Sequence, residues 1–352
     1  MDIQSEIVHS TRLSHIISAQ DPLENPQQGL IAHEPERQLR ASTSQRLVKS
    51  LDSIAIQLPE KPLAAKSLQV TTQTHKPYRE WSKLDRSNSY SALQKITAVW
   101  RKTGVADQYL IYENQHSDDR SFTWEVIPYR STSTCISRLW QQLLVLWKVI
   151  FGGSVPAESQ QLSELDETRP LFLDFDTSTQ RTHQVNDEQA GNDAFCQREV
   201  IAQQVVLEGK LVNVLYNYAP IGFGGERLHF LIVPTAHRTD FGTLSRDEYL
   251  EATDLAQKLM GHFSETRPIE NCYLYHKTGA DAGQTVLHWH LHLILTSSKS
   301  QDVFGKLTVL KNMIIGSSPI SREELADRVR GFREEFEGIQ NSSNLTSPTF
   351  VI

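Results

Sequence analysis

Residues 283–295 read Gly-Gln-Thr-Val-Leu-His-Trp-His-Leu-His-Leu-Ile-Leu, and this stretch decides both the fold class and the chemistry. Its three histidines alternate with apolar residues. Side chains two residues apart on a β-strand point to the same face. A strand over Leu287–Leu295 would therefore align three imidazoles on one face and bury the apolar residues, whereas a helix would scatter the imidazoles. The pattern predicts a reactive strand face backed by a core.

Two kinds of chemistry use such a face. Alternating histidines can bind zinc, but catalytic zinc sites often add a carboxylate, and this strand offers none in sequence. Alternatively, one imidazole attacks phosphorus while its neighbours set its tautomer and stabilise the leaving oxygens. The turn between Gly279 and Gly283 allows close approach of backbone to a phosphate. Covalent catalysis without a metal or other cofactor is the favoured interpretation, and a metal-dependent hydrolase is the weakest alternative.

The composition indicates a soluble globular protein with room for two domains. The chain has 352 residues and a net charge of -7, which argues against broad nucleic-acid binding but not against a small nucleotide. The three scattered cysteines (Cys135, Cys196 and Cys272) fit a reducing compartment. The N-terminus lacks a signal-peptide pattern, and the apolar run Leu139–Phe151 is too short and too polar to span a bilayer. We expect a cytoplasmic protein with no membrane partner.

Apolar periodicity divides the chain into segments. The predicted segments are a flexible tail at 1–45, a first strand–helix half at 46–155, a linker at 156–192, a second half at 193–300 and a C-terminal helical extension at 301–352. In the first half we expect a helix through Tyr90 to a cap at Gly104, strands at Gln108–Glu113 and Phe122–Tyr129, and a helix at Arg138–Phe151. In the second we expect strands at Lys210–Tyr218 and His229–Val233, a helix opened by the capping box Ser245/Glu248, and strands at Asn271–His276 and Thr285–Leu295. Helices at Val303–Ile315 and from Ser321 onward complete the prediction.

The two halves carry identical residues at a constant offset of 164, beginning with Tyr109 and Tyr273 (273 − 109). We interpret this as a tandem duplication. The alternative is two unrelated strand–helix units that share apolar residues. At this offset the three histidines fall on Trp124, Val126 and Pro128, so the first half lacks them.

The pattern His-apolar-His-apolar-His-apolar-apolar at 288–294 resembles the signature of the histidine-triad (HIT) superfamily. Residues 228–237 (LHFLIVPTAH) resemble the family's strand that opens with His and ends in Pro, and 217–220 resemble its ribose-contacting strand end. The resemblance implies an α+β fold over 193–300, an antiparallel sheet with flanking helices. The whole chain resembles the galactose-1-phosphate uridylyltransferase-like arrangement of two fused halves, here with a degenerate first half. Such a pseudo-dimer implies a monomer or a homodimer.

The resemblance also implies roles for individual residues. His290 matches the nucleophile, His288 and His292 match the imidazoles that flank it, and His229 matches a fourth histidine bonded into the triad. The implied nucleotide-binding residues are Asn217, Lys277, Gly283, Gln284 and Thr285. Two of these depart from the pattern, because Asn217 replaces a common acidic residue and Lys277 replaces a common amide. The loop Ile221–Arg227 is longer than usual, and His237 matches only a surface position.

The function implied is a nucleotide hydrolase that releases nucleoside monophosphate through a nucleotidyl-histidine intermediate. His292 resembles the hydrolases of the family, whereas its transferases usually carry Gln there. The alternatives are a nucleotidyltransferase or dinucleoside-polyphosphate phosphorylase, and a non-enzymatic nucleotide-binding sensor. In each case the expected ligand is a small nucleotide.

Overall fold

The structure is a computed structural model that describes residues 46–116, 121–131, 134–151, 153–173, 193–221, 227–296, 305, 307–308, 311–312 and 316–344. The chain divides into two units, Met1–Ser42 and Thr43–Ile352, and every described residue belongs to the second. The predicted tail at 1–45 and most of the helix predicted at Val303–Ile315 lie outside the described residues.

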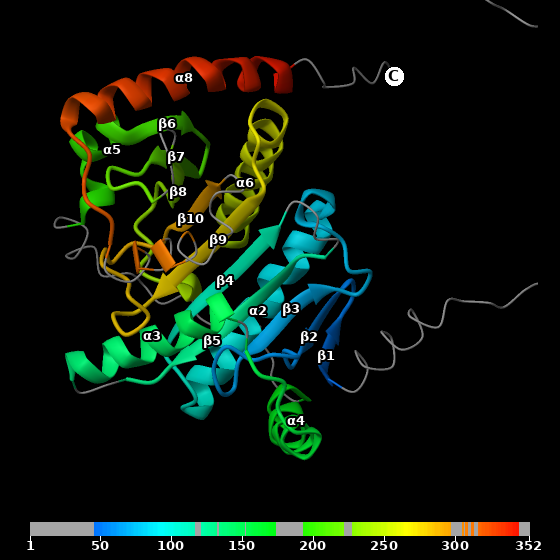
Figure 1. Ribbon diagram of the computed structural model, residues 1–352. Coiled ribbons are helices and arrows are strands. Elements are labelled where there is room, and N and C mark those ends of the chain that lie inside the picture. Colours follow the sequence, from blue (N-terminus) through cyan, green and yellow to red (C-terminus); the bar gives the residue numbers. More distant parts are fainter. Residues whose placement is uncertain are drawn as a thin grey trace, which may run out of the picture. The chain divides into compact units, whose positions relative to one another are not determined.

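The described residues form one antiparallel sheet of ten strands in the order β1-β2-β3-β5-β4-β9-β10-β8-β7-β6 (Figure 1). The strands are β1 (Leu47–Leu51), β2 (Ile54–Gln57), β3 (Leu68–Thr72), β4 (Gln108–His116), β5 (Thr123–Tyr129), β6 (Val205–Glu208), β7 (Val212–Tyr216), β8 (Leu228–Pro234), β9 (Asn271–Thr278) and β10 (Leu291–Thr296). The α+β class with an antiparallel sheet and flanking helices is confirmed.

Helices cover both faces of this sheet. They are α2 (Lys83–Thr103), α3 (Cys135–Phe151), α4 (Glu158–Leu173), α5 (Arg198–Gln204), α6 (Arg246–Thr266) and α8 (Arg322–Asn344), with 3-10 turns η1 (Tyr78–Glu80), η4 (Ala194–Cys196) and η5 (Phe241–Thr243). None of the described helices has the length and apolar composition to cross a bilayer.

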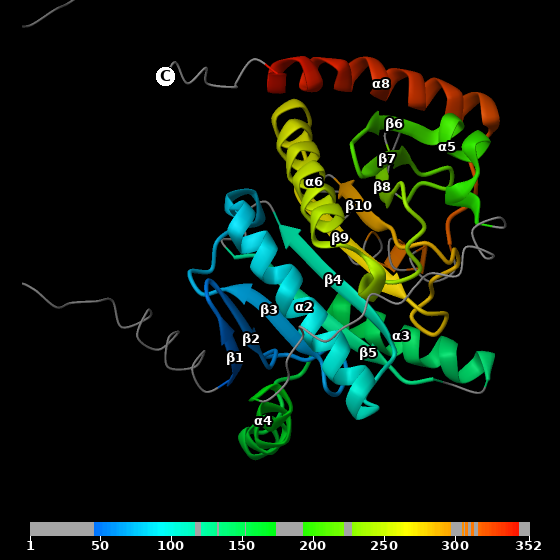
Figure 2. The same ribbon diagram turned by 180° about the vertical axis from the view of Figure 1, so that it is seen from behind.

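The larger hydrophobic core lies between one sheet face and helices α2, α4, α6 and α8. Figure 2 shows α2 and α6 laid across this face. Fully buried Phe172 and Phe263 belong to this core, and burial of each such side chain stabilises the fold by roughly 2–3 kcal/mol. Two smaller cores occupy the opposite face, one including Val145 of α3 and the other packed against Ile201 of α5. Between these two cores the same face carries His229 of β8 and His292 of β10.

Helices α2 and α6, which follow strands β3 and β8, both begin with a capping box. Ser245 accepts a hydrogen bond from the backbone N–H of Glu248 at 3.2 Å, and the Glu248 carboxylate accepts one from the Ser245 N–H at 2.7 Å, as predicted. Ser82 and Asp85 form the same arrangement at α2, which the sequence analysis missed. Each cap contributes about 1 kcal/mol. Gly104 ends α2 in the left-handed conformation with φ of 71°, as its spacing predicted.

The strand order reveals two equivalent halves. It reads β1-β2-β3-β5-β4 from one edge and β6-β7-β8-β10-β9 from the other, and in each half a long helix joins the third strand to the fourth. The halves meet where β4 pairs with β9. The two fused halves predicted from the internal repeat are confirmed, and they form one continuous sheet.

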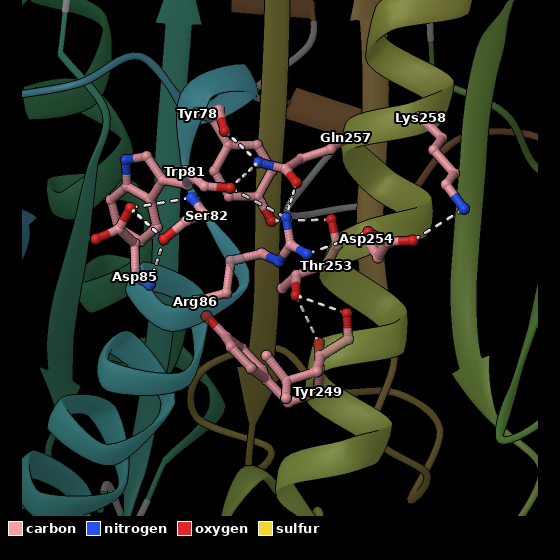
Figure 3. Close-up of polar contacts among 11 residues, drawn as sticks. Tyr78, Trp81, Ser82, Asp85, Arg86, Tyr249, Thr253, Asp254, Gln257 and Lys258 are labelled. Atoms are coloured by element: carbon pink, nitrogen blue, oxygen red, sulfur yellow. Dashed lines mark hydrogen bonds and ion pairs between the residues drawn. The ribbon is translucent and has the colours of Figure 1, made fainter. Parts of the chain in front are cut away.

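Helices α2 and α6 also join the halves through a polar network (Figure 3). The Arg86 guanidinium donates hydrogen bonds to Asp254 Oδ1 at 3.1 Å, to the backbone carbonyl of Trp81 at 3.1 Å and to Gln257 Oε1. Gln257 in turn donates to the backbone carbonyl of Tyr78. Because Arg86 is buried, loss of one partner would leave a charge uncompensated, and the network therefore fixes how the helices pack.

The constant offset of 164 is wrong by one residue in the central strands. It aligned Tyr109 with Tyr273, yet these side chains lie in cores on opposite faces of the sheet. The capping serines Ser82 and Ser245 of the equivalent helices differ by 163 (245 − 82). Tyr112 and Tyr275, which pair across the seam and share a face, differ by the same number (275 − 112). Because side chains alternate along a strand, a slip of one residue moves every side chain to the other face.

The triad positions of the first half are consequently reassigned. Tyr112 pairs with Glu125 and its equivalent Tyr275 pairs with His292, so these strands correspond at an offset of 167 (292 − 125). The residues equivalent to the triad are Ser121, Thr123 and Glu125, not Trp124, Val126 and Pro128. The prediction that the first half lacks catalytic histidines is unaffected.

The segment predicted as a linker contains an ordered helix. Leu165, Thr168 and Phe172 of α4 are buried, and Arg169 donates a hydrogen bond to the Leu47 carbonyl of β1 at 2.8 Å. Its apolar positions are few, which is why the sequence suggested a linker. The last predicted helix is confirmed as α8, and its predicted inner face is buried, with Leu325, Val329, Phe332 and Phe336 all in the core.

Candidate functional site

The site lies at the beginning of β10, and the predicted strand is shorter than expected. Only His292 of the triad lies within β10, whereas His288 and His290 precede it in non-strand backbone. The paired strand β8 ends at Pro234, which has no N–H to donate. Beyond that point the Trp289 N–H bonds to the Arg238 carbonyl instead. The prediction of a strand over Leu287–Leu295 is therefore wrong for its first four residues, and the longer run predicted at Thr285–Leu295 is wrong for its first six.

His290 has the tautomer that a nucleophile needs. Its Nδ1 lies 2.7 Å from the backbone carbonyl of His288, so Nδ1 carries the proton and donates it. This leaves the lone pair on Nε2. Burial lowers the pKa of His290 to about 4, so the ring is neutral at pH 7. A neutral imidazole with a fixed free lone pair is a competent nucleophile toward phosphorus.

His292 receives a fixed tautomer from a chain of hydrogen bonds. The Ile221 N–H donates to His229 Nδ1 at 3.0 Å, so His229 carries its proton on Nε2. That Nε2 donates to His292 Nδ1 at 3.0 Å. His292 consequently holds its own proton on Nε2. Burial lowers the pKa of both rings, that of His229 to about 3, and keeps them neutral.

The rings of the site are packed tightly. The His290 and His292 centroids lie 4.7 Å apart, and His292 stacks on Tyr275 at 4.2 Å with an interplanar angle of 11°. Phe195 of η4 meets the His290 ring edge-on at 5.4 Å. These contacts restrict ring rotation and hold the two imidazoles in a fixed relation.

His288 sits between two acceptors. Its Nδ1 lies 2.7 Å from Asp193 Oδ2 and its Nε2 lies 3.1 Å from the Pro234 carbonyl. Both ring nitrogens can donate only when the ring is protonated. Burial works to raise the pKa of Asp193, but hydrogen bonds from His288 and the Phe195 N–H outweigh it and lower the pKa below its usual range. The contacts with Asp193 and Pro234 therefore anchor the residue whose carbonyl orients His290.

Asp193, Cys196 and His237 are site residues that the sequence analysis missed or assigned to the surface. The ligand atoms of Asp193, Cys196 and His288 lie within 4.8 Å of one another, and His237 Nε2 lies 3.4 Å from Asp193 Oδ2. Carboxylate, thiol and imidazole are donors that suit zinc. This group is the one cluster of possible metal ligands among the residues that the structure describes. The Asp-x-x-Cys spacing just before the domain was the available signal.

The turn between Gly279 and Gly283 is held by the first half. Both glycines have positive φ (88° and 85°), as the predicted turn requires. Arg138 of α3 donates to Asp281 Oδ1 at 2.8 Å, and Gln108 of β4 donates to Asp281 Oδ2 at 2.9 Å. A Cβ on Gly283 would lie 3.2 Å from Lys277 Nζ. The ammonium group and the backbone of the turn therefore lie together, as a phosphate site requires.

The other predicted binding residues have local structural partners. Asn217 contacts the His229 ring through Nδ2 at 3.2 Å and accepts from the Ala219 N–H at 3.0 Å. Gln284 accepts from the Gly279 N–H at 2.8 Å and donates to the Thr239 carbonyl at 3.0 Å. Thr285 is exposed. Asn217 and Gln284 thus support the site, and their contacts with a nucleotide remain predictions. Residues 222–226 of the long loop lie outside the described residues.

Residues 198–299 match the HIT domain family. The C-terminal half of the chain therefore contains a HIT domain, and the resemblance seen in the sequence is confirmed. No curated protein is similar enough in sequence to match this chain.

Several solved structures are similar over most of the chain. A uridylyltransferase is 11% identical with a TM-score of 0.45, covering 90% of this chain and 94% of its own. A GalT-like protein from Arabidopsis thaliana is 13% identical with a TM-score of 0.43, covering 80% and 84%. A diadenosine triphosphate hydrolase from Plasmodium falciparum is 18% identical with a TM-score of 0.28, covering 39% and 78%. Likenesses this distant assign no activity to this chain.

Proposed function

We propose that this protein is a nucleotide hydrolase in which His290 takes a nucleoside monophosphate onto its ring. The single observation that carries the proposal is the hydrogen bond from His290 Nδ1 to the His288 carbonyl. It commits the lone pair to Nε2, the nitrogen that must attack. The low pKa of the ring keeps that lone pair unprotonated at neutral pH.

The reaction has two steps. In the first, a bond forms between His290 Nε2 and the α-phosphorus, and the bond to the leaving group breaks. The leaving group departs with the electron pair and takes a proton from solvent. In the second, a water oxygen attacks the same phosphorus, the pair returns to Nε2, and the water proton passes to solvent. Dividing one difficult displacement into two lowers each barrier.

Three groups supply donors for the phosphoryl oxygens. The Nε2–H of His292 is fixed by the hydrogen bond from His229, so it needs no reorganisation during the reaction. Burial lowers the pKa of Lys277 to about 8, which leaves most of the ammonium charged at pH 7. The backbone of the Gly279–Gly283 turn lies beside that ammonium. Together they balance negative charge that increases as the leaving group departs.

Hydrolysis is favoured over transfer because His292 occupies the third triad position, where the resemblance associates His with hydrolases and Gln with transferases. A nucleotide phosphate is the expected substrate class. The three free cysteines fit the reducing cytoplasm that the sequence suggested.

The test uses the purified full-length protein with adenosine phosphoramidate and with a diadenosine polyphosphate, without added metal. Wild type is expected to release adenosine monophosphate, and His290→Ala is expected to lose that activity by at least about 10³-fold. His262→Ala is the matched control, because His262 lies on α6 and pairs with Glu335 away from the site. Equal turnover by wild type and His290→Ala would refute the proposal. Release of product only when phosphate or a sugar phosphate is present would identify a transferase instead.

A further inference from the structure

Helix α3 exposes an unusual number of large apolar side chains. Its sequence is CISRLWQQLLVLWKVIF. Six of its side chains are between 41% and 71% exposed, and these are Ile136, Leu139, Trp140, Leu143, Leu144 and Trp147. Monomeric proteins rarely leave a contiguous apolar surface of this kind uncovered. We call these six residues the α3 stripe.

The α3 stripe has the spacing of a packing face. Successive members lie three, one, three, one and three residues apart, which places them on one side of a helix. In most globular helices that side faces the core. Here it faces outward, and the inward side carries Arg138, Gln141, Gln142 and Lys148 together with buried Val145. The amphipathic pattern of α3 is therefore inverted.

Specific contacts hold α3 in this orientation. Arg138 Nε donates to Asp281 Oδ1 and Gln142 Nε2 donates to the Asp281 carbonyl, each at 2.8 Å. Val145 packs with Ile127 of β5 in the smaller core. Rolling the helix to bury the stripe would break both hydrogen bonds and remove Val145 from its core. Figure 1 shows α3 apart from α2, α6 and α8, which pack on the other face.

We infer that the α3 stripe is an interface between two copies of this chain, with α3 packed on α3 across a two-fold axis. A self-complementary patch of this kind closes a dimer without leaving a free copy of the surface. Rows of apolar side chains at spacings of three and four interdigitate in helix pairs. Two tryptophans in the stripe are of the residue type that most often dominates interface energies.

The area of the stripe suits such a dimer. An aromatic side chain presents about 150–250 Å², and a leucine or isoleucine somewhat less. The exposed fractions then amount to on the order of 700 Å² per copy, close to the ~800 Å² that each partner buries in a stable interface.

Charge favours a second copy over a lipid surface. The charged residues of α3 are Arg138 and Lys148, and both lie on the inward side. Arg138 pairs there with Asp281, and the charge of Lys148 partly opposes the rise in the pKa of Glu125 that burial causes. The stripe thus presents no charge to repel its own copy. A helix that lies on anionic lipid usually carries basic residues beside its apolar face, and this chain has a net charge of -7.

The test is sedimentation velocity of the full-length protein across the micromolar range. Wild type is expected to be a dimer, and Leu144→Glu and Trp140→Glu are expected to raise the dimer dissociation constant by a hundredfold or more, since each change enters the interface twice. Leu84→Glu is the matched control, because Leu84 is 63% exposed on α2. It should leave the dimer intact. Near-ultraviolet circular dichroism checks that each variant is folded.

A second measurement tests the geometry. In a Cys135→Ser background, Leu143→Cys near the middle of the stripe should form a covalent dimer on mild oxidation, and Leu84→Cys should not. A monomeric wild type, an unchanged dimer in Leu144→Glu, or equal dissociation by Leu84→Glu would overturn the inference. Binding of a monomer to phosphatidylserine vesicles, lost in Leu144→Glu, would overturn it in favour of a lipid surface.

Discussion

The two halves of the molecule share a topology and differ at one buried polar pair. In the second half His229 of β8 donates to His292 of β10 at 3.0 Å. In the first half the equivalent residues are Ser67 and Glu125, which also form a hydrogen bond. A backbone N–H also donates to one member of each pair: the Leu63 N–H to Glu125 at 3.0 Å, and the Ile221 N–H to His229 at 3.0 Å. The fold thus requires a satisfied polar pair at this place, but it does not require imidazoles.

Reactivity depends on what the second half adds to that shared pair. Thr123 occupies the position of His290, the proposed nucleophile, in the first half, so that position has no imidazole there. Burial suppresses charge in both halves, raising the pKa of Glu125 to about 7 and lowering that of His229 to about 3. The two halves thus share a scaffold, and the residues of the proposed chemistry lie in the second half.

The largest effect is expected when His292 of the second half is replaced by glutamate, the residue that stands at the equivalent position, Glu125, in the first half. His292→Glu removes the fixed Nε2–H donor and places a carboxylate near phosphate oxygens. Nucleotide release is expected to fall by roughly 10²–10³-fold or more. Steady-state kinetics measures this.

The reciprocal control is Glu125→Gln, which keeps an acceptor for the Leu63 N–H and should leave turnover nearly unchanged. A comparable loss in Glu125→Gln would show that the first half takes part in the chemistry. Retention of full activity in His292→Glu would show that the donor has no role.

A smaller effect is expected from Asp193→Asn. The amide retains an acceptor for His288 but is a weaker one than the carboxylate, so the ring is held less firmly and kcat should fall by roughly 10–10²-fold. A separate prediction concerns metal: dialysis of wild type against EDTA should leave kcat unchanged, because the proposed reaction requires no metal at the reacting nitrogens. Loss of activity after dialysis, restored by zinc, would show that Asp193, Cys196 and His288 hold a functional metal instead.

The smallest expected effects are on the free energy of unfolding. Glu125 of the first half and His229 of the second should change it with pH in opposite directions. The folded pKa of Glu125 is raised, so the folded state binds more protons and stability falls as pH rises from about 4.5 to about 7. Glu125→Gln should remove this decline, on the order of 2 kcal/mol. The folded pKa of His229 is lowered, so its contribution is complete above about 6.5 and is lost as pH falls. Urea unfolding of wild type and Glu125→Gln at several pH values measures this. If the free energy of unfolding of wild type and of Glu125→Gln changed equally with pH, the assignment of this decline to Glu125 would be contradicted.

Much of the fold could be predicted from local patterns. The apolar spacing around Tyr90, the glycine at 104 and the Ser245/Glu248 box each predicted a helix or its end correctly, because caps and periodicity are encoded within a few residues. The repeat predicted two halves. The register within that repeat could not be read from identities, since alternation along β4 and β9 decides which residues are equivalent, and pairing is a tertiary property.

The candidate site could be predicted only in part, because the sequence shows local motifs but not contacts between distant segments. The three histidines and His229 are brought together as expected, because a short motif carries them. Asp193 and Cys196 come from one segment and His237 from another, and only the folded chain places them beside His288. Gln284 and Asn217 were read as nucleotide contacts, but their side-chain atoms already bond to Gly279, Thr239, Ala219 and His229. Sequence identifies a side chain's chemistry more readily than its partners.

In the proposed reaction His290 Nε2 carries the nucleotide during turnover. The most direct test is to mix the full-length protein with a radiolabelled adenosine phosphoramidate, stop the reaction in alkali within the first turnover, and map the label by mass spectrometry. The account predicts one adenylylated residue, His290, in wild type and none in His290→Ala. Label on another residue, or turnover in His290→Ala at the wild-type rate, would contradict it.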